Sequence, residues 1–324
     1  MHTKLRMQYV SPFDREYSSH YDHVAQFNRG IMGQISTDLN RVFRDFEGDV
    51  AVSTTGSDGR LEKGPFSPME MRVYGERVYL DESLRFLRRY VSEEGKIHIF
   101  DDFIEPKDLS GSKMNYLEMS IGGRDVLIAS PNRFFDSETL FETDGVYKKA
   151  YGNIVEELNG SNGSSIFKKV KEKARECKRV TTSGIQSYSG GALNHYDLEQ
   201  GMAFYDPEKK IWSFKQGPLR LVQFSLVKDS IKKLRESNRD NEFIFGLPRN
   251  TIDKISRIEV EGRTPLSIGG IDDLSDSYKF FLHQYHRSQF NFAENGSKTL
   301  EFDPKEVRER CESLRAICSD PIIN

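Results

Sequence analysis

The chain has 324 residues, a length that accommodates two domains of ordinary size. Charged residues make up 30% and hydrophobic residues 36%, which supplies a globular core and excludes the composition of a disordered chain. The 47 basic and 50 acidic residues give a net charge of -3, which excludes a protein that holds nucleic acid through its overall charge. A local basic patch remains compatible with this balance.

The segments that direct a chain to a membrane are not found. No apolar run is long enough to span a bilayer, and the first residues lack the apolar part of a secretion signal. The cysteines are Cys177, Cys311 and Cys318, an odd number with no Cys-x-x-Cys pair, so a disulfide framework is not expected. These features predict a protein of the reducing cytoplasm. If the protein is exported by a route without such a signal, the prediction is the cytosol of a host cell.

The first half of the chain predicts a mixture of helices and strands. Apolar residues spaced three and four apart predict a long helix over 24–46. A β-rich run over 49–54, a Gly-Ser turn over 56–59 and a second extended run over 69–74 follow. One more helix and two more strands are expected beyond them, over 81–91, 96–100 and 116–121. This order predicts an α/β or α+β unit that ends near residue 145.

The second half predicts helices. A helical pattern over 146–180 is interrupted by the turn-forming residues 159–165, and a Gly-, Ser- and Tyr-rich segment with short extended pieces covers 181–217. Two apolar stripes then mark helices, formed by Phe224, Val227, Ile231 and Leu234 and by Leu274, Tyr278, Phe281, Leu282 and Tyr285. We therefore predict an α+β protein with domains over 1–145 and 146–324, the second mostly helical.

Residues 56–74 carry the most informative chemistry. A strand runs into a Gly-Ser turn, and about ten residues later a second strand begins near the acidic residue Glu70. Backbone N–H groups of such a turn can hold phosphate oxygens, and glycine permits a close approach. Residues 68 and 70 share one face of a strand, where a carboxylate can bind Mg²⁺, a cation that prefers oxygen ligands. The pattern predicts a site for a nucleotide and its metal.

This segment resembles the signature of the DNA polymerase β nucleotidyltransferase superfamily. It is most similar to bacterial PII uridylyltransferase and to nucleotidyltransferases that are often fused to CBS domains. Their pattern, Gly-Gly/Ser-x-Gly-Arg-x-Glu followed by Ser-Asp-x-Asp, is matched without a gap by Gly56, Ser57, Gly59, Arg60, Glu62, Ser67 and Glu70. Residues 215–223 resemble the family's Lys-x-Gly-(Pro)-Gly-Leu-Arg-Asp-Ile-Gln segment, and residues 273–314 resemble its closing helical region.

The resemblance implies an α/β-like nucleotidyltransferase domain with a mixed sheet, followed by a mostly helical domain that closes one wall of a cleft. It implies transfer of a nucleoside monophosphate from an NTP to an acceptor hydroxyl, with Mg²⁺ or Mn²⁺; in PII uridylyltransferase the acceptor is a protein tyrosine. Glu70 and Glu118 are the expected catalytic and metal-binding residues. The expected nucleotide-binding residues are Gly56, Ser57, Gly59, Arg60, Lys215 and Arg220.

The sequence departs from the family pattern at two positions. The first metal carboxylate is replaced by Pro68, and the Asp of the Leu-Arg-Asp segment is replaced by Leu221. Glu118 is the candidate for the third carboxylate, with Asp101, Asp102 and Asp125 as rivals. These departures favour the alternative of a pseudoenzyme that binds a nucleotide or a protein. Aminoglycoside nucleotidyltransferases share the superfamily, but the matches over 215–223 and 273–314 argue against that activity.

Each assignment has a simpler alternative. Residues 56–60 can form an ordinary hairpin, Glu70 can be a solvated strand residue, and Arg60 can pair with Glu62 or Asp58. The basic run over 168–175 favours a solvated helix face over a nucleic-acid site, because acidic residues interleave. The expected partner is an NTP, and the resemblance leaves the acceptor open, with a protein as one candidate. The sequence has no strong signal for binding nucleic acid, and no membrane partner is expected.

Overall fold

The computed structural model describes thirteen stretches of the chain, which include most of the segments discussed above. They are residues 17–45, 50–64, 71–75, 105–108, 135–143, 145–147, 158–187, 193–194, 214–236, 248–260, 271–295, 299–300 and 303–317. Helices and a small sheet together confirm the predicted α+β class. The expected helix over 81–91 and the strands over 96–100 and 116–121 lie outside the described residues.

A four-stranded mixed sheet holds the motif. Its order is β3-β2-β1-β4, with β1 (Val50–Thr54) antiparallel to β2 (Met71–Gly75) and to β4 (Glu138–Glu142), and β2 parallel to β3 (Glu105–Asp108). Every residue of β1 is buried, as expected for a central strand of small and β-branched residues. The predicted strands over 49–54 and 69–74 are confirmed within two residues.

Strand β4 was not predicted from the sequence. Its five residues, Glu-Thr-Leu-Phe-Glu, bury Leu140 and expose Glu138 and Glu142. This short polar stretch becomes a strand because it pairs with the edge of β1. Tertiary context therefore outweighs its modest strand propensity.

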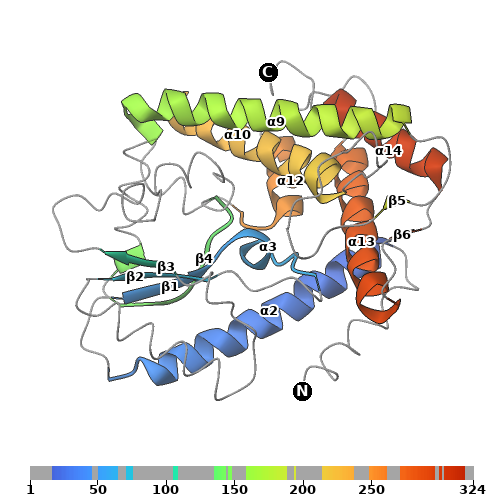
Figure 1. Ribbon diagram of the computed structural model, residues 1–324. Helices are drawn as coiled ribbons and strands as arrows, with labels where there is room; N and C mark the ends of the chain where they lie inside the picture. The colour runs from blue at the N-terminus through green and yellow to red at the C-terminus, as the bar shows by residue number, and fades with distance from the viewer. Residues whose placement is uncertain are drawn as a thin grey trace.

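Helix α2 (Tyr17–Val42) confirms the first predicted helix and begins seven residues before its first expected apolar position. It buries Val24, Ile35 and Leu39. The helix packs on β4, where the hydroxyl of Ser36 donates to the carbonyl of Leu140 at 2.7 Å. Its other end packs on α13 (Ile271–Asn295) (Figure 1). Helix α2 thus joins the sheet to the helical part of the protein.

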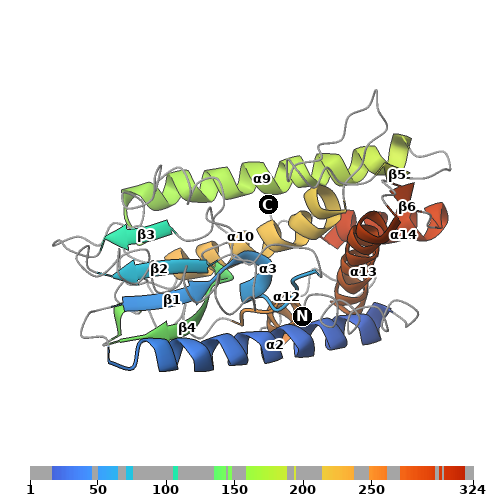
Figure 2. The ribbon, with the colours of Figure 1, turned by 60° about the horizontal axis from the view of Figure 1, so that its bottom comes forward.

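The helical part consists of α9 (Ser161–Ser187), α10 (Arg220–Glu236), α12 (Thr251–Val260), α13 and α14 (Pro304–Ile317). Both predicted apolar stripes are buried in one core that these helices share. Helix α9 lies along α10 on one side of the molecule, and α2 runs along the opposite side (Figures 1 and 2). A two-stranded antiparallel ladder joins β5 (Leu193–Asn194) to β6 (Thr299–Leu300).

The predicted interruption over 159–165 is too long. Helix α9 begins at Ser161 and continues to Ser187, although its first turns are rich in Ser, Asn and Gly. The glycine at position 163 is required by packing, because a Cβ atom there would lie 1.7 Å from the carbonyl oxygen of Leu158. The close approach of two backbones requires glycine and fixes the start of the helix. Packing here overrides the low helix propensity of the residues.

Among the residues that the structure describes, no helix combines the length and apolarity needed to cross a membrane. Cys177 and Cys311 are both buried, and neither forms a disulfide within the described part of the chain. The division into domains at residue 145 stays a prediction.

Candidate functional site

The Gly-Ser segment forms one helical turn, α3 (Gly56–Gly59), between the adjacent strands β1 and β2. The sequence predicted a simple turn at this place, so the position between strands is confirmed and the conformation differs. The helical turn is closed by the N–H groups of Arg60 and Glu62, which donate to the carbonyls of Gly56 at 3.1 Å and Ser57 at 2.8 Å. The first N–H groups of a helical turn have no acceptor within it and can receive one from a ligand.

Two glycines of the motif are required by geometry. Gly56 has φ of +64°, a left-handed conformation that glycine adopts without steric cost. A Cβ atom on Gly59 would lie 1.7 Å from the carbonyl oxygen of Asp136, so that the backbone preceding β4 passes directly over the turn. The glycine pattern therefore serves the packing of α3, whatever the turn binds.

Replacing Gly59 by alanine should destabilise the protein by about 3 kcal/mol or more, because the clash is with backbone that cannot rotate away. Urea unfolding of the full chain measures the change. Gly33→Ala in α2 is the matched control, since a Cβ atom there meets nothing within 4 Å and should slightly stabilise the helix. Equal unfolding midpoints for the two variants would contradict the close approach at Gly59.

Leu61 follows α3 with φ of 61°, an unusual conformation for a residue with a branched side chain. Hydrogen bonds fix it on both sides. Its N–H donates to the carbonyl of Asp58 at 3.0 Å, and the side-chain amide of Asn28 donates to the carbonyls of Leu61 and Lys63 at 3.2 and 3.1 Å. Helix α2 thus holds the exit of the motif in a strained conformation, as is common near functional sites.

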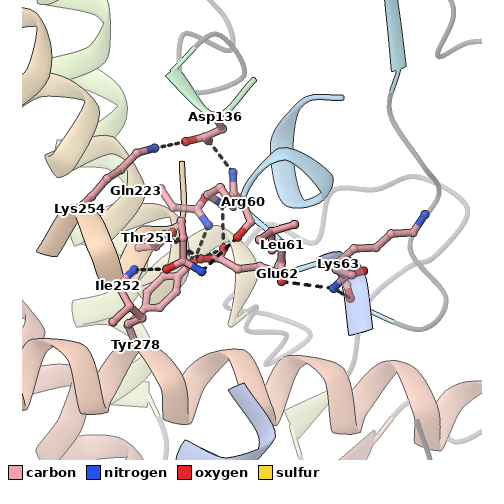
Figure 3. A network of polar contacts seen from close by, with 12 residues as sticks. Arg60, Leu61, Glu62, Lys63, Asp136, Gln223, Thr251, Ile252, Lys254 and Tyr278 are labelled. Carbon is pink, nitrogen blue, oxygen red and sulfur yellow. Dashed lines mark hydrogen bonds and ion pairs between the residues drawn. The ribbon is translucent and has the colours of Figure 1, made fainter. Parts of the chain in front are cut away.

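Arg60 is buried and forms ion pairs with two carboxylates (Figure 3). Its Nε donates to Glu62 Oε2 at 2.7 Å, and its Nη1 donates to Asp136 Oδ2 at 2.6 Å. Burial by itself would lower the pKa of Arg60, but Asp136 and Glu62 outweigh it and raise the pKa well above its ordinary value. The pairing with Glu62 was one of the sequence alternatives, and its role here is to support the loop. Asp58, the other alternative, pairs with Lys63 at 3.3 Å.

Glu62 joins the motif to two helices. The hydroxyl of Tyr278 in α13 donates to Glu62 Oε2 at 2.7 Å, and the N–H of Thr251 at the start of α12 donates to Oε1 at 3.3 Å. A carboxylate at a helix N-terminus is stabilised by the unsatisfied N–H groups there. Burial and the charge of Glu62 raise the pKa of Tyr278 well above its ordinary value, so this hydroxyl keeps its proton.

Asp136 brings a second cation into the network. Lys254 of α12 donates from Nζ to Asp136 Oδ1 at 2.5 Å and to the carbonyl of Phe135 at 3.2 Å. Burial lowers the pKa of Lys254, and Asp136 opposes that shift. The four charges of Arg60, Lys254, Glu62 and Asp136 therefore balance in the interior. Sequence reasoning missed Asp136 and Lys254, because no local pattern marks either residue as a partner of Arg60.

The second and third matched segments reach the same network. Gln223 of α10, the glutamine that ends the 215–223 match, donates to the hydroxyl of Tyr278 at 2.9 Å. His286 of α13 lies 3.0 Å from the carbonyl oxygen of Glu62 through Nε2. Tyr278 and His286 are both positions of the 273–314 match. All three segments of the resemblance therefore meet around Glu62.

A pair of buried histidines extends the network to α2. His20 Nε2 lies 3.0 Å from His286 Nδ1. Because the Glu62 carbonyl only accepts, His286 Nε2 carries the proton, and its neutral Nδ1 accepts from His20. Burial, with the neighbouring His286 and His283, lowers the pKa of His20 to about 2, and burial lowers the pKa of His286 to about 3. The contact between His20 and His286 was not predicted from the sequence, because the two residues are 266 positions apart.

Lys215 and Arg220 lie at the junction of a five-residue π-helix, η2 (Lys215–Leu219), with α10. Lys215 Nζ lies 5.7 Å from the ring centre of Tyr285 in α13, and Gly217 packs on Val180 and Thr181 of α9. Both cations are partly exposed. Leu221, which replaces the family's aspartate, is buried in the core and supplies no charge.

The expected metal ligands Glu70 and Glu118 lie outside the described residues, as do Pro68 and the rivals Asp101, Asp102 and Asp125. Met71, where β2 begins, pairs with Thr54, the last residue of β1 before α3. The residue preceding Met71 in the sequence is Glu70. Within the described part of the chain, no group of three or more His, Cys, Asp or Glu side chains could hold a metal ion.

Comparison of the sequence with models of known protein families and with curated proteins finds no match.

Proposed function

We propose that the protein is a nucleotidyltransferase-like protein that binds an NTP with Mg²⁺ beside α3. The reaction would transfer a nucleoside monophosphate to an acceptor hydroxyl, for which a protein side chain is the first candidate. One observation carries the proposal: Glu62, Gln223, Tyr278 and His286, drawn from three separate matched segments, form one hydrogen-bonded network. Chance matches scattered over the chain would have no reason to meet in space.

In this proposal the first N–H groups of α3, at Gly56 and Ser57, bind the triphosphate. Gly59 keeps the turn tight, and Arg60 holds the turn in place through Glu62 and Asp136. Lys215, where η2 begins, and Arg220, where α10 begins, are partly exposed and supply positive charge for the phosphates. The described residues thus supply the binding loop and its support.

Glu70 and Glu118 would hold the Mg²⁺ ion. Carboxylate oxygens are the ligands that Mg²⁺ takes, and it needs only one or two of them besides phosphates and water. The register of β2 supports Glu70, because Met71 is paired at the end of β1 from which α3 departs. Such a metal, when bound, neutralises charge that develops on the phosphates during transfer.

Pro68 and Leu221 favour a second candidate function, a pseudoenzyme that binds nucleotide without turnover. Leu221 is the specific observation, because its side chain is 1% exposed and packs in the core where the family pattern has a carboxylate. A site with one metal can bind the triphosphate, but it lacks the second metal, which activates the attacking hydroxyl. We therefore expect metal-dependent binding with slow or absent transfer.

Calorimetric titration of the full chain with ATP and UTP, with and without Mg²⁺, tests the proposal. Wild type should bind only with the metal, and Glu70→Gln should weaken that binding by roughly tenfold or more, since it removes one charged metal ligand. Pro68→Asp should strengthen it. Glu309→Gln, an exposed carboxylate of α14, is the matched control and should bind as wild type does.

Absence of nucleotide binding by wild type under both conditions would overturn the proposal, and equal binding by Glu70→Gln would overturn the metal assignment. Turnover is read separately, by incubating the protein with labelled NTP, Mg²⁺ or Mn²⁺ and a cell lysate. A labelled product identifies an active transferase. Binding without a labelled product, together with a product from Pro68→Asp, identifies the pseudoenzyme.

A further inference from the structure

The exit segment of the motif, residues 61–63, has every carbonyl held by a side chain from a distant helix. Asn28 of α2 donates from Nδ2 to the carbonyls of Leu61 at 3.2 Å and Lys63 at 3.1 Å. The carbonyl of the residue between them accepts from Nε2 of His286 in α13 at 3.0 Å. Carbonyls of a loop usually bond to water or to nearby backbone. Here two helices fix the orientation of three consecutive peptide groups.

The exit segment is held against the conformational preference of Leu61. A residue with a branched side chain seldom adopts φ of 61°, because its Cβ atom crowds the backbone there. Without the bonds to the carbonyls, a negative φ is favoured, and the peptide groups on the two sides of Leu61 would turn relative to each other. The N–H groups of Leu61 and Glu62 donate to the carbonyls of Asp58 at 3.0 Å and Ser57 at 2.8 Å. Such a rotation therefore breaks the bonds that close α3.

Asn28 is explained by its donors and not by packing. The residue is wholly buried in α2, and its Oδ1 accepts no hydrogen bond from the part of the chain that the structure describes. A buried acceptor without a partner costs stability, and asparagine has low helix propensity. An apolar side chain would avoid both costs. The two bonds to the exit segment give asparagine a role, and an unsatisfied group of this kind is common where a structure stores strain.

The surrounding network limits how far the exit segment can move. Glu62 Oε2 accepts from Arg60 and from Tyr278, both at 2.7 Å (Figure 3). Lys63 Nζ lies 3.3 Å from Asp58 Oδ1 of α3. These buried ion pairs and hydrogen bonds hold the side chains on either side of the strained residue. A rearrangement is therefore confined to the peptide groups and leaves the rest of the fold in place.

We propose that the exit segment is a two-state switch that couples α2 to the α3 turn. In the held state Asn28 and His286 keep Leu61 left-handed, and α3 is closed. In the released state Asn28 loses both bonds, Leu61 takes a negative φ, and α3 opens. Coupling between two sites is reciprocal, so a ligand that binds the closed turn also strengthens the contact with α2. That this ligand is a triphosphate rests on the proposed function, whereas the switch itself does not.

Hydrogen exchange of the full chain, followed by mass spectrometry of peptides that cover residues 56–63, tests the switch. Asn28→Leu nearly keeps the side-chain volume and removes both donors. It should speed exchange of these peptides roughly tenfold or more, because the strain at Leu61 then has no opposing bonds from α2. Adding Leu61→Gly to Asn28→Leu should return exchange to within about threefold of the wild-type rate, because glycine adopts a left-handed conformation without steric cost. Circular dichroism checks that each variant is folded.

Asn40→Leu is the matched control, because the Nδ2 of this exposed asparagine in α2 donates to Ser36 of the same helix at 2.7 Å. It should exchange as wild type does over residues 56–63. Exchange of Asn28→Leu at the wild-type rate overturns the switch. Failure of Leu61→Gly to slow the exchange of the double variant also overturns it, since Asn28 would then act through the packing of α2.

Leu61→Gly in the wild-type background is a second test, which decides the matter even if Asn28→Leu does not fold. Removing the strain while Asn28 keeps its bonds should slow exchange over the same peptides. An equal or faster rate than that of wild type contradicts the switch.

Calorimetric titration with ATP and UTP in the presence of Mg²⁺ separates the switch from the proposed function. Asn28→Leu should bind roughly tenfold more weakly than wild type, and the double variant with Leu61→Gly should recover most of that loss. Equal binding by wild type and Asn28→Leu, with their exchange rates different, overturns the coupling to the nucleotide. Absence of binding by wild type overturns the proposed function, and exchange over residues 56–63 then decides the switch by itself.

Discussion

Replacing Arg60 by alanine should cost about 3–5 kcal/mol of the free energy of unfolding. The guanidinium forms ion pairs with Glu62 at 2.7 Å and Asp136 at 2.6 Å, and all three side chains are almost wholly buried. Its removal leaves two buried carboxylates with Lys254 as the one remaining cation of the network. An interior charge without its partner is far more costly than an exposed one. Urea unfolding measures the loss.

The same experiment separates charge from geometry. Arg60→Lys keeps the charge but cannot present two donors in a fixed fork to both carboxylates, so an intermediate loss is expected. Adding Asp136→Asn to Arg60→Ala should cost less than Asp136→Asn costs in wild type, because the two residues are coupled. Lys305→Ala, whose ion pair with Glu309 is exposed, is the control and should change stability by less than 1 kcal/mol. Additive effects at positions 60 and 136 would contradict the network.

Mild acid should destabilise the protein before its carboxylates titrate. The pKa values of His20 and His286 are lowered by burial to about 2 and about 3. Below pH ~6.5 the unfolded chain binds protons at these residues and the folded protein does not, so stability falls with pH until the folded pKa values are reached. Between pH 7.5 and 5.5 each histidine should cost about 1.4 kcal/mol, and the pair about 3 kcal/mol.

The pH dependence distinguishes this effect from simple loss of packing. A His20→Gln, His286→Gln variant should be less stable at pH 7.5 yet lose little more on acidification, so its stability curve is flatter than that of wild type. Gln26→Ala, at an exposed and uncharged position of the same helix, should retain the wild-type slope. Chemical denaturation at several pH values supplies the curves. A wild-type curve that is flat from pH 7.5 to 5.5 would show that the two histidines take up protons in the folded state.

The support around Glu62 gives the proposed site a physical rationale. A phosphate-binding turn must keep its N–H groups in place while a ligand arrives. The strained backbone of Leu61 favours a rearrangement that would move those groups. Glu62 counters it by bonding to α12 and α13, and Asn28 fixes the carbonyl of Leu61 from α2. Preorganised donors of this kind bind developing charge without rearrangement. Variants in the network are therefore expected to impair nucleotide binding through the position of the turn.

The sequence by itself determined the elements whose signals are local. Runs of residues with high strand propensity place β1 and β2, and period-3.6 patterns place the apolar faces of α2, α10 and α13, because the spacing reflects which side of a helix is buried. The motif placed α3 between two adjacent strands, since its glycines allow a turn that other residues resist. The pairing of Arg60 with Glu62 could also be predicted, because the two residues are only two positions apart in the sequence.

Only the tertiary structure decided which distant residues complete the site. Asp136 is 76 positions from Arg60, and Tyr278 is 216 positions from Glu62, so no local pattern could connect them. Strand β4 and the first turn of α9 exist because of their neighbours, the edge of β1 and the carbonyl of Leu158, and against the tendency of their own residues. Charge pairing and close backbone contact depend on where the chain returns in space, and that is fixed by the packing of the whole core.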